Sequence, residues 1–330
     1  MWLHRYATLV SAATILLIVA GGLVTSTGSG LSVPDWPTTY GWSMFTFPLS
    51  KMVGGIYYEH GHRLIASVVG LLTIGLVLWI WRAERRQWMK WLSAAALGAV
   101  VLQGVLGGAT VLFLLPASIS VAHAGLAQAF FCVTVALALF TSPGWRRPGP
   151  SAGVAPGWAD DGRLRRLTTV ASGVIYAQIL IGAWMRHTGA GLAIPDFPLV
   201  FGGLMPRRWT AQIAVNYAHR LGAVAVAAAV AAAASYVWHR HRARPELTGP
   251  AALLAGLVLV QIVLGGLTVL TREAVAINTA HVATGALVLA ASVVLTLRAY
   301  RARFASDPPG RADAAGMSPS WPRPGAGARG

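Results

Sequence analysis

Long apolar runs alternate with short polar segments along most of the 330-residue chain. A run of about 18 or more apolar residues is long enough to form a helix that spans a membrane. Glycines within such runs are tolerated, because neighbouring helices pack against the exposed backbone. The pattern predicts an all-α membrane protein with eight transmembrane helices, at residues 7–24, 64–81, 91–112, 120–140, 167–184, 213–238, 251–270 and 276–297.

The composition supports a membrane protein rather than a soluble globular domain. Hydrophobic residues make up 55% of the chain and charged residues 11%, and the mean hydropathy is +0.60. The formal net charge of +16 would suit a nucleic-acid-binding protein, but its distribution has another explanation. With the N-terminus in the cytoplasm, 19 of the 26 Lys and Arg residues fall on the cytoplasmic side, as is typical of membrane proteins. We expect a multi-pass protein of the cell inner (plasma) membrane, with both termini cytoplasmic and no nucleic-acid partner.

The chain contains an internal repeat. QGVLGGATVL at 103–112 returns as QIVLGGLTVL at 261–270, and TGSGLSVPDWP at 27–37 returns as TGAGLAIPDFP at 188–198. The offsets are 158 and 161 residues, and the HRL at 62–64 returns at 219–221. Because the repeated unit contains an even number of helices, both copies have the same orientation. The sequence therefore predicts two parallel-repeat four-helix bundles, and the first apolar run belongs to a bundle rather than to a cleaved signal peptide.

The repeat divides the chain into four predicted parts. Residues 1–141 form the N-terminal bundle and residues 167–304 the C-terminal bundle. Residues 142–166 are rich in Pro, Gly and Arg and form a cytoplasmic linker, and residues 305–330 form a disordered cytoplasmic tail. Cys132 is the only cysteine, which excludes a disulfide within the chain and any C-x-x-C motif for heme or zinc.

Four histidines are candidate metal ligands: His62, His123, His219 and His281. Each lies near the start of an even-numbered predicted helix and has a counterpart in the other copy. A single histidine of this kind is more often a helix-to-helix hydrogen-bond partner. Four at matched positions and similar depth favour two facing pairs, one in each bundle, which is the arrangement that axial ligation of a heme iron requires. Zinc is less suitable, because neither half offers three or four clustered ligands.

Four other histidines and two neighbouring arginines have simpler interpretations. His4, His239 and His241 flank helices on the basic side, where we expect them to be solvated. His187 lies beside Arg186 and its counterpart is Ser26, so we also expect it to be solvated. Arg63 and Arg220 follow two of the candidate ligands directly, and we expect them to pair with heme propionates.

Glu-x-x-His-Arg at 59–63, the repeated histidine pairs and TGSGLSVPDWP at 27–37 together resemble heme A synthase, over about residues 7–300. The resemblance implies an oxidoreductase that converts the C8 methyl of heme O to a formyl group, by two successive hydroxylations through heme I. It implies heme b as cofactor, bound by His219 and His281, and heme O bound by His62 and His123. Many members have a cysteine pair in the first outer loop, whereas residues 35–55 contain none. The chain therefore resembles a cysteine-free variant.

Glu59 is the candidate catalytic residue, because its counterpart in the second copy is the uncharged Asn216. In a helix, a spacing of three places Glu59 and His62 on one face. A carboxylate near the substrate could accept a proton or stabilise positive charge that develops on the methyl carbon. The simpler alternative is an ion pair with Arg63 or Lys51 at a helix end.

Two other functions remain open. A bis-histidine diheme cytochrome that passes electrons from quinol would explain the four histidines but not the Glu59/Asn216 difference. A heme or small-molecule transporter would need a polar path, and the inner halves of the predicted helices provide no polar residues for one. The expected partners of a heme A synthase are heme O, heme O synthase and an electron acceptor in the membrane, and a homo-oligomer is also considered.

Overall fold

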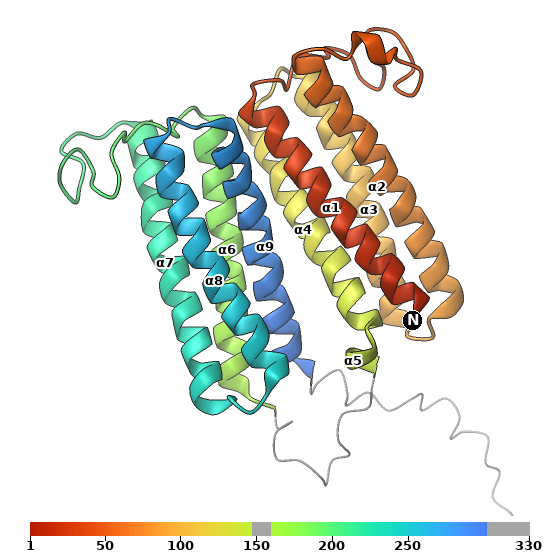
Figure 1. Cartoon of the computed structure of the whole chain (residues 1–330), viewed down its shortest axis with the longest axis vertical. Helices are drawn as coiled ribbons and strands as arrows, with labels where there is room; N and C mark the ends of the chain where they lie inside the picture. Colours follow the sequence, from red (N-terminus) through yellow and green to blue (C-terminus); the bar gives the residue numbers. More distant parts are fainter. Residues whose placement is uncertain (147–159, 302–330) are drawn as a thin grey trace, which may run out of the picture.

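The computed structural model describes residues 1–146 and 160–301 (Figure 1). The predicted tail lies outside the described residues, as do residues 147–159 of the predicted linker. Within the described residues the chain forms helices and no β-strand, apart from two isolated bridges in loops. The long helices are α1 (Trp2–Ser26), α2 (Gly55–Ala83), α3 (Gln87–Leu112), α4 (Ala117–Thr141), α6 (Gly162–His187), α7 (Ala211–Arg240), α8 (Pro245–Leu270) and α9 (Val275–Ala299).

All eight long helices are long enough and apolar enough to span a membrane, which confirms the predicted all-α fold with eight membrane-spanning segments. They contain 25 to 30 residues each, about 38–45 Å at 1.5 Å per residue, against a hydrocarbon core of about 30 Å. Each of the eight apolar runs lies inside one of these helices. Two short elements accompany them, α5 (Pro143–Arg146) and a 3-10 turn (Leu49–Lys51).

The long helices pack as two groups of four (Figure 1). In the N-terminal group α1, α2, α3 and α4 follow one another around a ring, and α4 closes the ring against α1. The helices α6, α7, α8 and α9 form a second ring in the same order. As a result α2 lies diagonally opposite α4, and α7 lies diagonally opposite α9. Helices α1, α4, α6 and α9 form the contact between the two groups.

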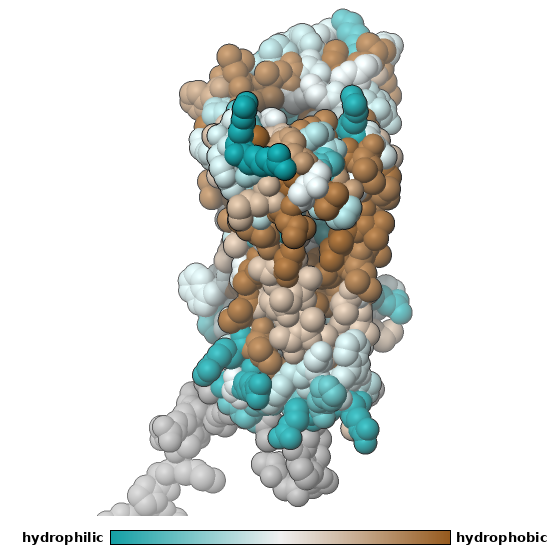
Figure 2. All heavy atoms as spheres, turned by 90° about the vertical axis from the view of Figure 1, so that its left-hand side faces the viewer, coloured by the Kyte–Doolittle hydropathy of each residue, from teal (hydrophilic) through white to brown (hydrophobic). Residues whose placement is uncertain are grey.

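The apolar core of each bundle lies at the end where α1 begins and α9 ends. It includes Leu76, Ile80 and Leu137 in the N-terminal bundle and Leu247 and Leu295 in the C-terminal bundle, all of them fully buried. The outer surface is apolar as well: Figure 2 shows a band of hydrophobic residues between polar ends on the side formed by α7 and α8. Such a surface suits contact with lipid chains.

Two long loops cover the other end of the molecule, residues 27–54 over the N-terminal bundle and residues 188–210 over the C-terminal bundle (Figure 1). We refer to this end as the outer end. Each loop has a cis peptide bond before Pro37 or Pro198. Each also has a glycine at φ +76°, Gly41 or Gly202, a backbone conformation that glycine adopts without strain. The repeated sequence motif of the two loops thus folds into the same turn twice.

Candidate functional site

The four predicted ligand histidines occupy equivalent places in the two bundles. His62 lies on α2 and His123 on α4, and His219 and His281 lie on α7 and α9. Each is the seventh to ninth residue of its helix, about two turns from the outer end. Because α2 and α4 are diagonal neighbours, and so are α7 and α9, each pair spans the interior of one bundle. The imidazoles of each pair lie within electrostatic range of each other.

A glycine on the preceding helix faces every one of these imidazoles. A Cβ atom built on Gly21 would lie 3.1 Å from Cε1 of His62, and one built on Gly182 would lie 2.8 Å from Cε1 of His219. The corresponding distances are 3.2 Å for Gly107 to His123 and 3.2 Å for Gly265 to His281. A methyl group at these positions would push against the rings. The glycines therefore decide where the imidazoles lie, and they repeat between the two halves as the histidines do.

The ring nitrogens leave room for ligation. Nδ1 of His62, His123 and His281 is buried and has no hydrogen-bond partner within the described chain. These rings approach the backbone carbonyls of Leu17, Gln103 and Gln261, one helical turn before the facing glycines. The C-terminal pair also has side-chain contacts. Nε2 of Gln178 lies 3.0 Å from Nδ1 of His219 and donates to the His219 carbonyl oxygen at 2.7 Å, and Nε2 of Gln261 lies 3.4 Å from Nε2 of His281. Two imidazoles that face each other across an apolar bundle fit a flat metal macrocycle with two axial ligands.

Arg63 and Arg220 connect the outer loops to α2 and α7 by hydrogen bonds. The Arg63 guanidinium donates hydrogen bonds to the carbonyl oxygens of Val33, Asp35 and Thr38 and to the Glu59 carboxylate, at 2.7 to 3.0 Å. The Arg220 guanidinium makes the equivalent set, to the carbonyl oxygens of Ile194, Asp196 and Leu199 and to Oδ1 of Asn216, at 2.8 to 3.0 Å. Although we expected both side chains to face heme propionates, their hydrogen bonds go to the loops.

Glu59 is 4% exposed and lies inside α2 rather than at its head. Its carboxylate accepts hydrogen bonds from the Val33 N–H at 2.8 Å and from Arg63 at 2.7 Å. The ion pair with Arg63 that we considered is thus present, whereas Lys51 lies over the Trp42 ring.

Asn216 has the matching contacts in the other half of the chain. It donates to the carbonyl oxygens of Ala190 and Gly191 at 2.9 and 2.8 Å and accepts from Arg220. Both residues therefore fasten the first part of an outer loop to a helix, and only one of them is charged.

Two loop aromatics that the sequence did not single out also belong to the sites. The Trp36 ring packs against Gly108 and the Phe197 ring against Gly266. Each of these glycines directly follows one that faces a ligand histidine. Trp36 and Phe197 have the same position in the repeated loop motif, and Gly108 and Gly266 have the same position in the repeated LGG motif. That both motifs occur in both copies was the sequence signal for a contact between them. The first glycine of each pair accommodates an imidazole and the second an aromatic residue of the loop.

Aspartates stabilise the turns that present these aromatics. Burial alone would raise the pKa of Asp35, but the N–H groups of Gly41 and Tyr40 and the Thr38 hydroxyl lower it to about 2. The N–H groups of Gly202 and Phe201 lower the pKa of Asp196 in the same way. Both aspartates are therefore ionised near neutral pH, and the loops are fixed by charge-assisted hydrogen bonds.

The other predicted histidines lie away from the two pairs, apart from His187. His187 ends α6 and is half-buried within electrostatic range of His123, although we expected it to be solvated. His4, which we expected to be solvated, donates from Nδ1 to the Ala138 carbonyl oxygen at 2.9 Å, and this bond joins its ring to α4. His239 is exposed, as expected, and His241 lies 2.9 Å from Asp161.

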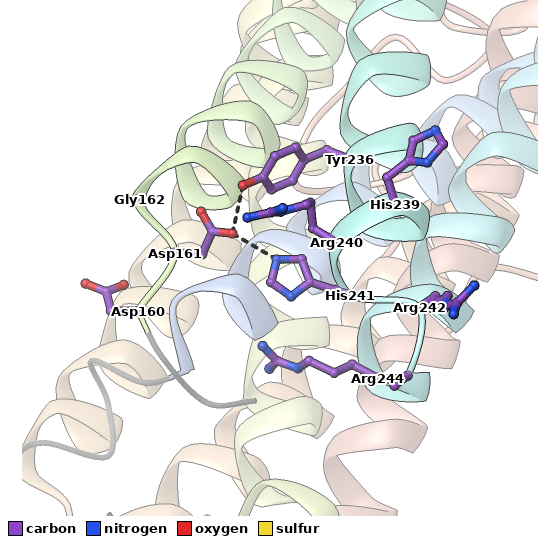
Figure 3. A pocket seen from close by; sticks show the side chains of 10 residues that line it. Asp160, Asp161, Gly162, Tyr236, His239, Arg240, His241, Arg242 and Arg244 are labelled. Carbon is purple, nitrogen blue, oxygen red and sulfur yellow. Dashed lines mark hydrogen bonds and ion pairs between the residues drawn. The ribbon is translucent and has the colours of Figure 1, made fainter. Parts of the chain in front are cut away.

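A cavity of about 660 Å³ at the end opposite the loops has a structural explanation (Figure 3). Asp161 caps α6 by accepting from the N–H groups of Arg163 and Leu164, and it also accepts from the Tyr236 hydroxyl at 3.0 Å. With the His241 contact, these bonds join the start of α6 to the end of α7. The cavity beside them lies at the opposite end of the bundle from His219 and His281.

Comparisons with known proteins give matches over most of the chain. A family described as cytochrome oxidase assembly protein matches residues 4–293. The chain is 32% identical to the heme A synthase of Symbiobacterium thermophilum, over 80% of this chain and 84% of that protein. It is 29% identical to the heme A synthase of Shouchella clausii, over 82% of this chain and 88% of that protein. It is 30% identical to the heme A synthase of a Caulobacter species, over 91% of this chain and 96% of that protein.

Proposed function

The chain belongs to the family of cytochrome oxidase assembly proteins, and from its four glycine-facing histidines we propose that it is a heme A synthase. It is a multi-pass membrane protein, which we assign to the cell inner (plasma) membrane. The proposed reaction converts the C8 methyl of heme O to a formyl group, by two successive hydroxylations through heme I and loss of water. The observation that supports this most directly is the pair of diagonal imidazoles in each bundle, since the reaction needs one heme as substrate and one as cofactor.

We assign the cofactor to the C-terminal bundle and the substrate to the N-terminal bundle. His219 and His281 would bind heme b, and His62 and His123 would bind heme O. When bound, heme b supplies one-electron redox chemistry. Gln178 supports the assignment, because a polar side chain lies beside the His219 ring, 3.0 Å from Nδ1, where the N-terminal bundle has Leu17 at the matching position.

Glu59 is the proposed catalytic residue at the substrate. The Val33 N–H and the Arg63 guanidinium fix its carboxylate one turn from His62. We propose that the carboxylate accepts the proton released as the methyl group gives up two electrons to the electron acceptor, or stabilises the positive charge that develops there. Arg63 and Arg220 contribute by fastening the loops over the two bundles, and Trp36 and Phe197 pack the same loops against α3 and α8.

One observation favours a second function, a bis-histidine diheme cytochrome that carries electrons from quinol. Glu59 and Asn216 fasten their loops in the same way, so the difference between them need not involve catalysis. Extraction of the pigments from the purified protein distinguishes the two functions. A heme A synthase yields heme O, heme I or heme A beside protoheme, whereas an electron carrier yields protoheme alone.

The ligand assignment is tested in the same preparation. His219→Ala or His281→Ala should remove the low-spin heme b spectrum while the protein still inserts into the membrane. His239→Ala, at an exposed position, is the matched control and should keep it. A normal bis-imidazole spectrum in both ligand variants would contradict the assignment. The partners that we propose are heme O synthase as donor of the substrate and an electron acceptor in the membrane.

A further inference from the structure

Arg186 breaks the repeat at a position next to the C-terminal histidine pair. It lies four residues after Gly182, which faces His219, so both residues project from the same side of α6. Arg186 is about 6 Å nearer the outer end, at 1.5 Å per residue. The corresponding residue in the N-terminal bundle, four after Gly21, is Thr25. A cation therefore lies one turn outside the imidazoles in one bundle and is replaced by a hydroxyl in the other.

The guanidinium of Arg186 has unused donor capacity. The side chain is half-buried, and its one hydrogen bond within the described chain is to the Ser26 hydroxyl, at 3.2 Å. Thr279 donates to the same hydroxyl from α9, at 3.1 Å. An arginine has five N–H donors, and leaving most of them unpaired in a half-buried place is unfavourable unless an anion binds there. Arg186 also lies within electrostatic range of His281.

The arginines first expected to bind heme carboxylates do not have this capacity. Arg63 and Arg220 each donate four hydrogen bonds to their own loop and helix. A heme bound at the C-terminal pair would still bring two propionates into an apolar bundle, where unpaired charge is costly. Among the described residues, Arg186 is the cation that combines proximity to His281 with free donors.

We infer that Arg186 binds a heme carboxylate at the C-terminal pair and so distinguishes a site that retains its heme from a site that exchanges it. The inference rests on the proposed assignment of heme b to His219 and His281. Thr25 at the equivalent place offers no charge, which suits a site where heme O must enter and heme A must leave. The site that retains heme b and the site that exchanges heme O would thus differ at one position, which is Arg186 in α6 and Thr25 in α1.

Glu273 is the competing partner of Arg186. It lies in the turn between α8 and α9, within electrostatic range of Arg186, but the two side chains form no ion pair within 4 Å in the described structure. Its counterpart in the N-terminal bundle, opposite Gly30, is Leu115. If Arg186 served only to fix this turn through Glu273, removing either charge would have the same effect on the heme.

The experiment compares Arg186→Gln, Arg186→Lys and Glu273→Gln in the full-length protein isolated with its heme. The midpoint potential of the low-spin heme b is measured, together with the rate at which heme b is lost to excess apomyoglobin. Arg186→Gln should lower the midpoint potential, because the variant loses a cation that disfavours the oxidised iron. A tenfold change in the redox equilibrium corresponds to about 59 mV for one electron. Heme loss should be about tenfold faster or more, since charge-assisted hydrogen bonds are among the strong ones.

The other two variants separate the explanations. Arg186→Lys should keep most of the potential and part of the retention, because the charge remains but the forked donor does not. Glu273→Gln should raise the midpoint potential, because it removes a negative charge near the heme. If Arg186 and Glu273 formed only a structural ion pair, Glu273→Gln would instead have the same effect as Arg186→Gln. Wild-type potential and heme loss in Arg186→Gln would overturn the inference, as would identical effects of Arg186→Gln and Glu273→Gln. Absence of heme b from the wild-type protein would instead contradict the proposed function.

Discussion

Glu59 and Asn216 show that one position can have the same structural role with a different charge. Both are buried, at 4% and 2% exposure, and both join the first part of an outer loop to a helix. The hydrogen bonds explain why each side chain is polar in an apolar bundle, since a buried polar group without a partner is costly. They do not explain why one is a carboxylate. The proposal that Glu59 is catalytic therefore depends on its charge alone.

Replacing Glu59 with glutamine tests the charge with little change in shape. The amide oxygen of Gln can still accept a hydrogen bond from the Val33 N–H or from Arg63. We expect heme b to be retained, because its ligands lie in the other bundle, and conversion of heme O to heme A to fall by about 10²–10⁴-fold. Pigments extracted from membranes should then show accumulated heme O or heme I.

Asn216→Ala is the matched control for Glu59→Gln. It removes the equivalent loop contacts from the C-terminal bundle and leaves the carboxylate in place. We expect this variant to be less stable to heating in detergent and to produce the usual ratio of heme A to heme O. Normal heme A formation by Glu59→Gln would mean that the residue only fastens its loop.

At the scale of the helices, the glycines that face the histidines give a sharp prediction. The Cβ of Gly182→Ala would lie 2.8 Å from Cε1 of His219, closer than real Cβ contacts, so the ring or the helix must shift. We expect this variant to lose the low-spin heme b spectrum. Gly173→Ala lies on the same helix with no atom within 4 Å of the new methyl group, and it should keep the spectrum. An intact spectrum in both would show that the bundle adapts to the methyl group.

The turn between α2 and α3 depends on a carboxylate outside the membrane-spanning helices. Glu84 pairs with Arg86 at 2.7 Å and with Arg146 of α5 at 2.9 Å, and Arg86 also donates to the Phe140 carbonyl of α4. Burial alone would raise the pKa of Glu84, but the two arginines lower it from 4.5 to about 2. The stability from this network is therefore fully present above pH 4.5 and is lost as the pH falls toward 2.

We expect Glu84→Gln to lower thermal stability above pH 4.5, by on the order of 2 kcal/mol, and to matter less as the pH falls. The measurement is the melting temperature of wild type and variant in detergent between pH 7 and pH 3. The difference between the two curves should shrink toward acid pH. A difference that stays constant over this range would mean that the Glu84 charge does not stabilise the turn.

The helices could be predicted from the sequence because their apolar runs are long, but their polar ends could not. Helix α2 begins at Gly55, nine residues before the predicted run, and α6 begins at Gly162, inside the predicted linker. The missed part of α2 contains Glu59, His62 and Arg63, whose polarity is satisfied by an i,i+4 ion pair and by loop contacts. A hydropathy pattern shows that these residues are polar but not which partners satisfy them, so it placed the start of α2 too late.

For the whole molecule, the repeat in the sequence predicted which residues correspond, and the structure adds what they contact. The histidine pairs followed from matched positions and a common helix direction. The contacts of Arg63 with Val33, Asp35 and Thr38 did not, because they depend on how a 28-residue loop folds back. The difference between Arg186 and Thr25 was readable in the sequence, but its meaning depends on the glycine one turn away. The sequence pattern therefore does not predict contacts between residues that are far apart in the chain.

The orientation of the whole chain is the remaining prediction. The structure places the turns at Arg86 and Arg242 at the same end as the start of α1, and the loops at Lys51 and Arg207 at the other end (Figure 1). Because most Lys and Arg residues lie at the first end, we expect that end to face the cytoplasm. Alkaline phosphatase fused after Lys51 or Arg207 should be active, because it folds only outside the cytoplasm, and the same fusion after Arg86 or Arg242 should be inactive. Green fluorescent protein fusions at the four positions serve as the reciprocal control. The opposite pattern would place all four histidines near the cytoplasmic surface, and heme O would then have to reach His62 and His123 from that side.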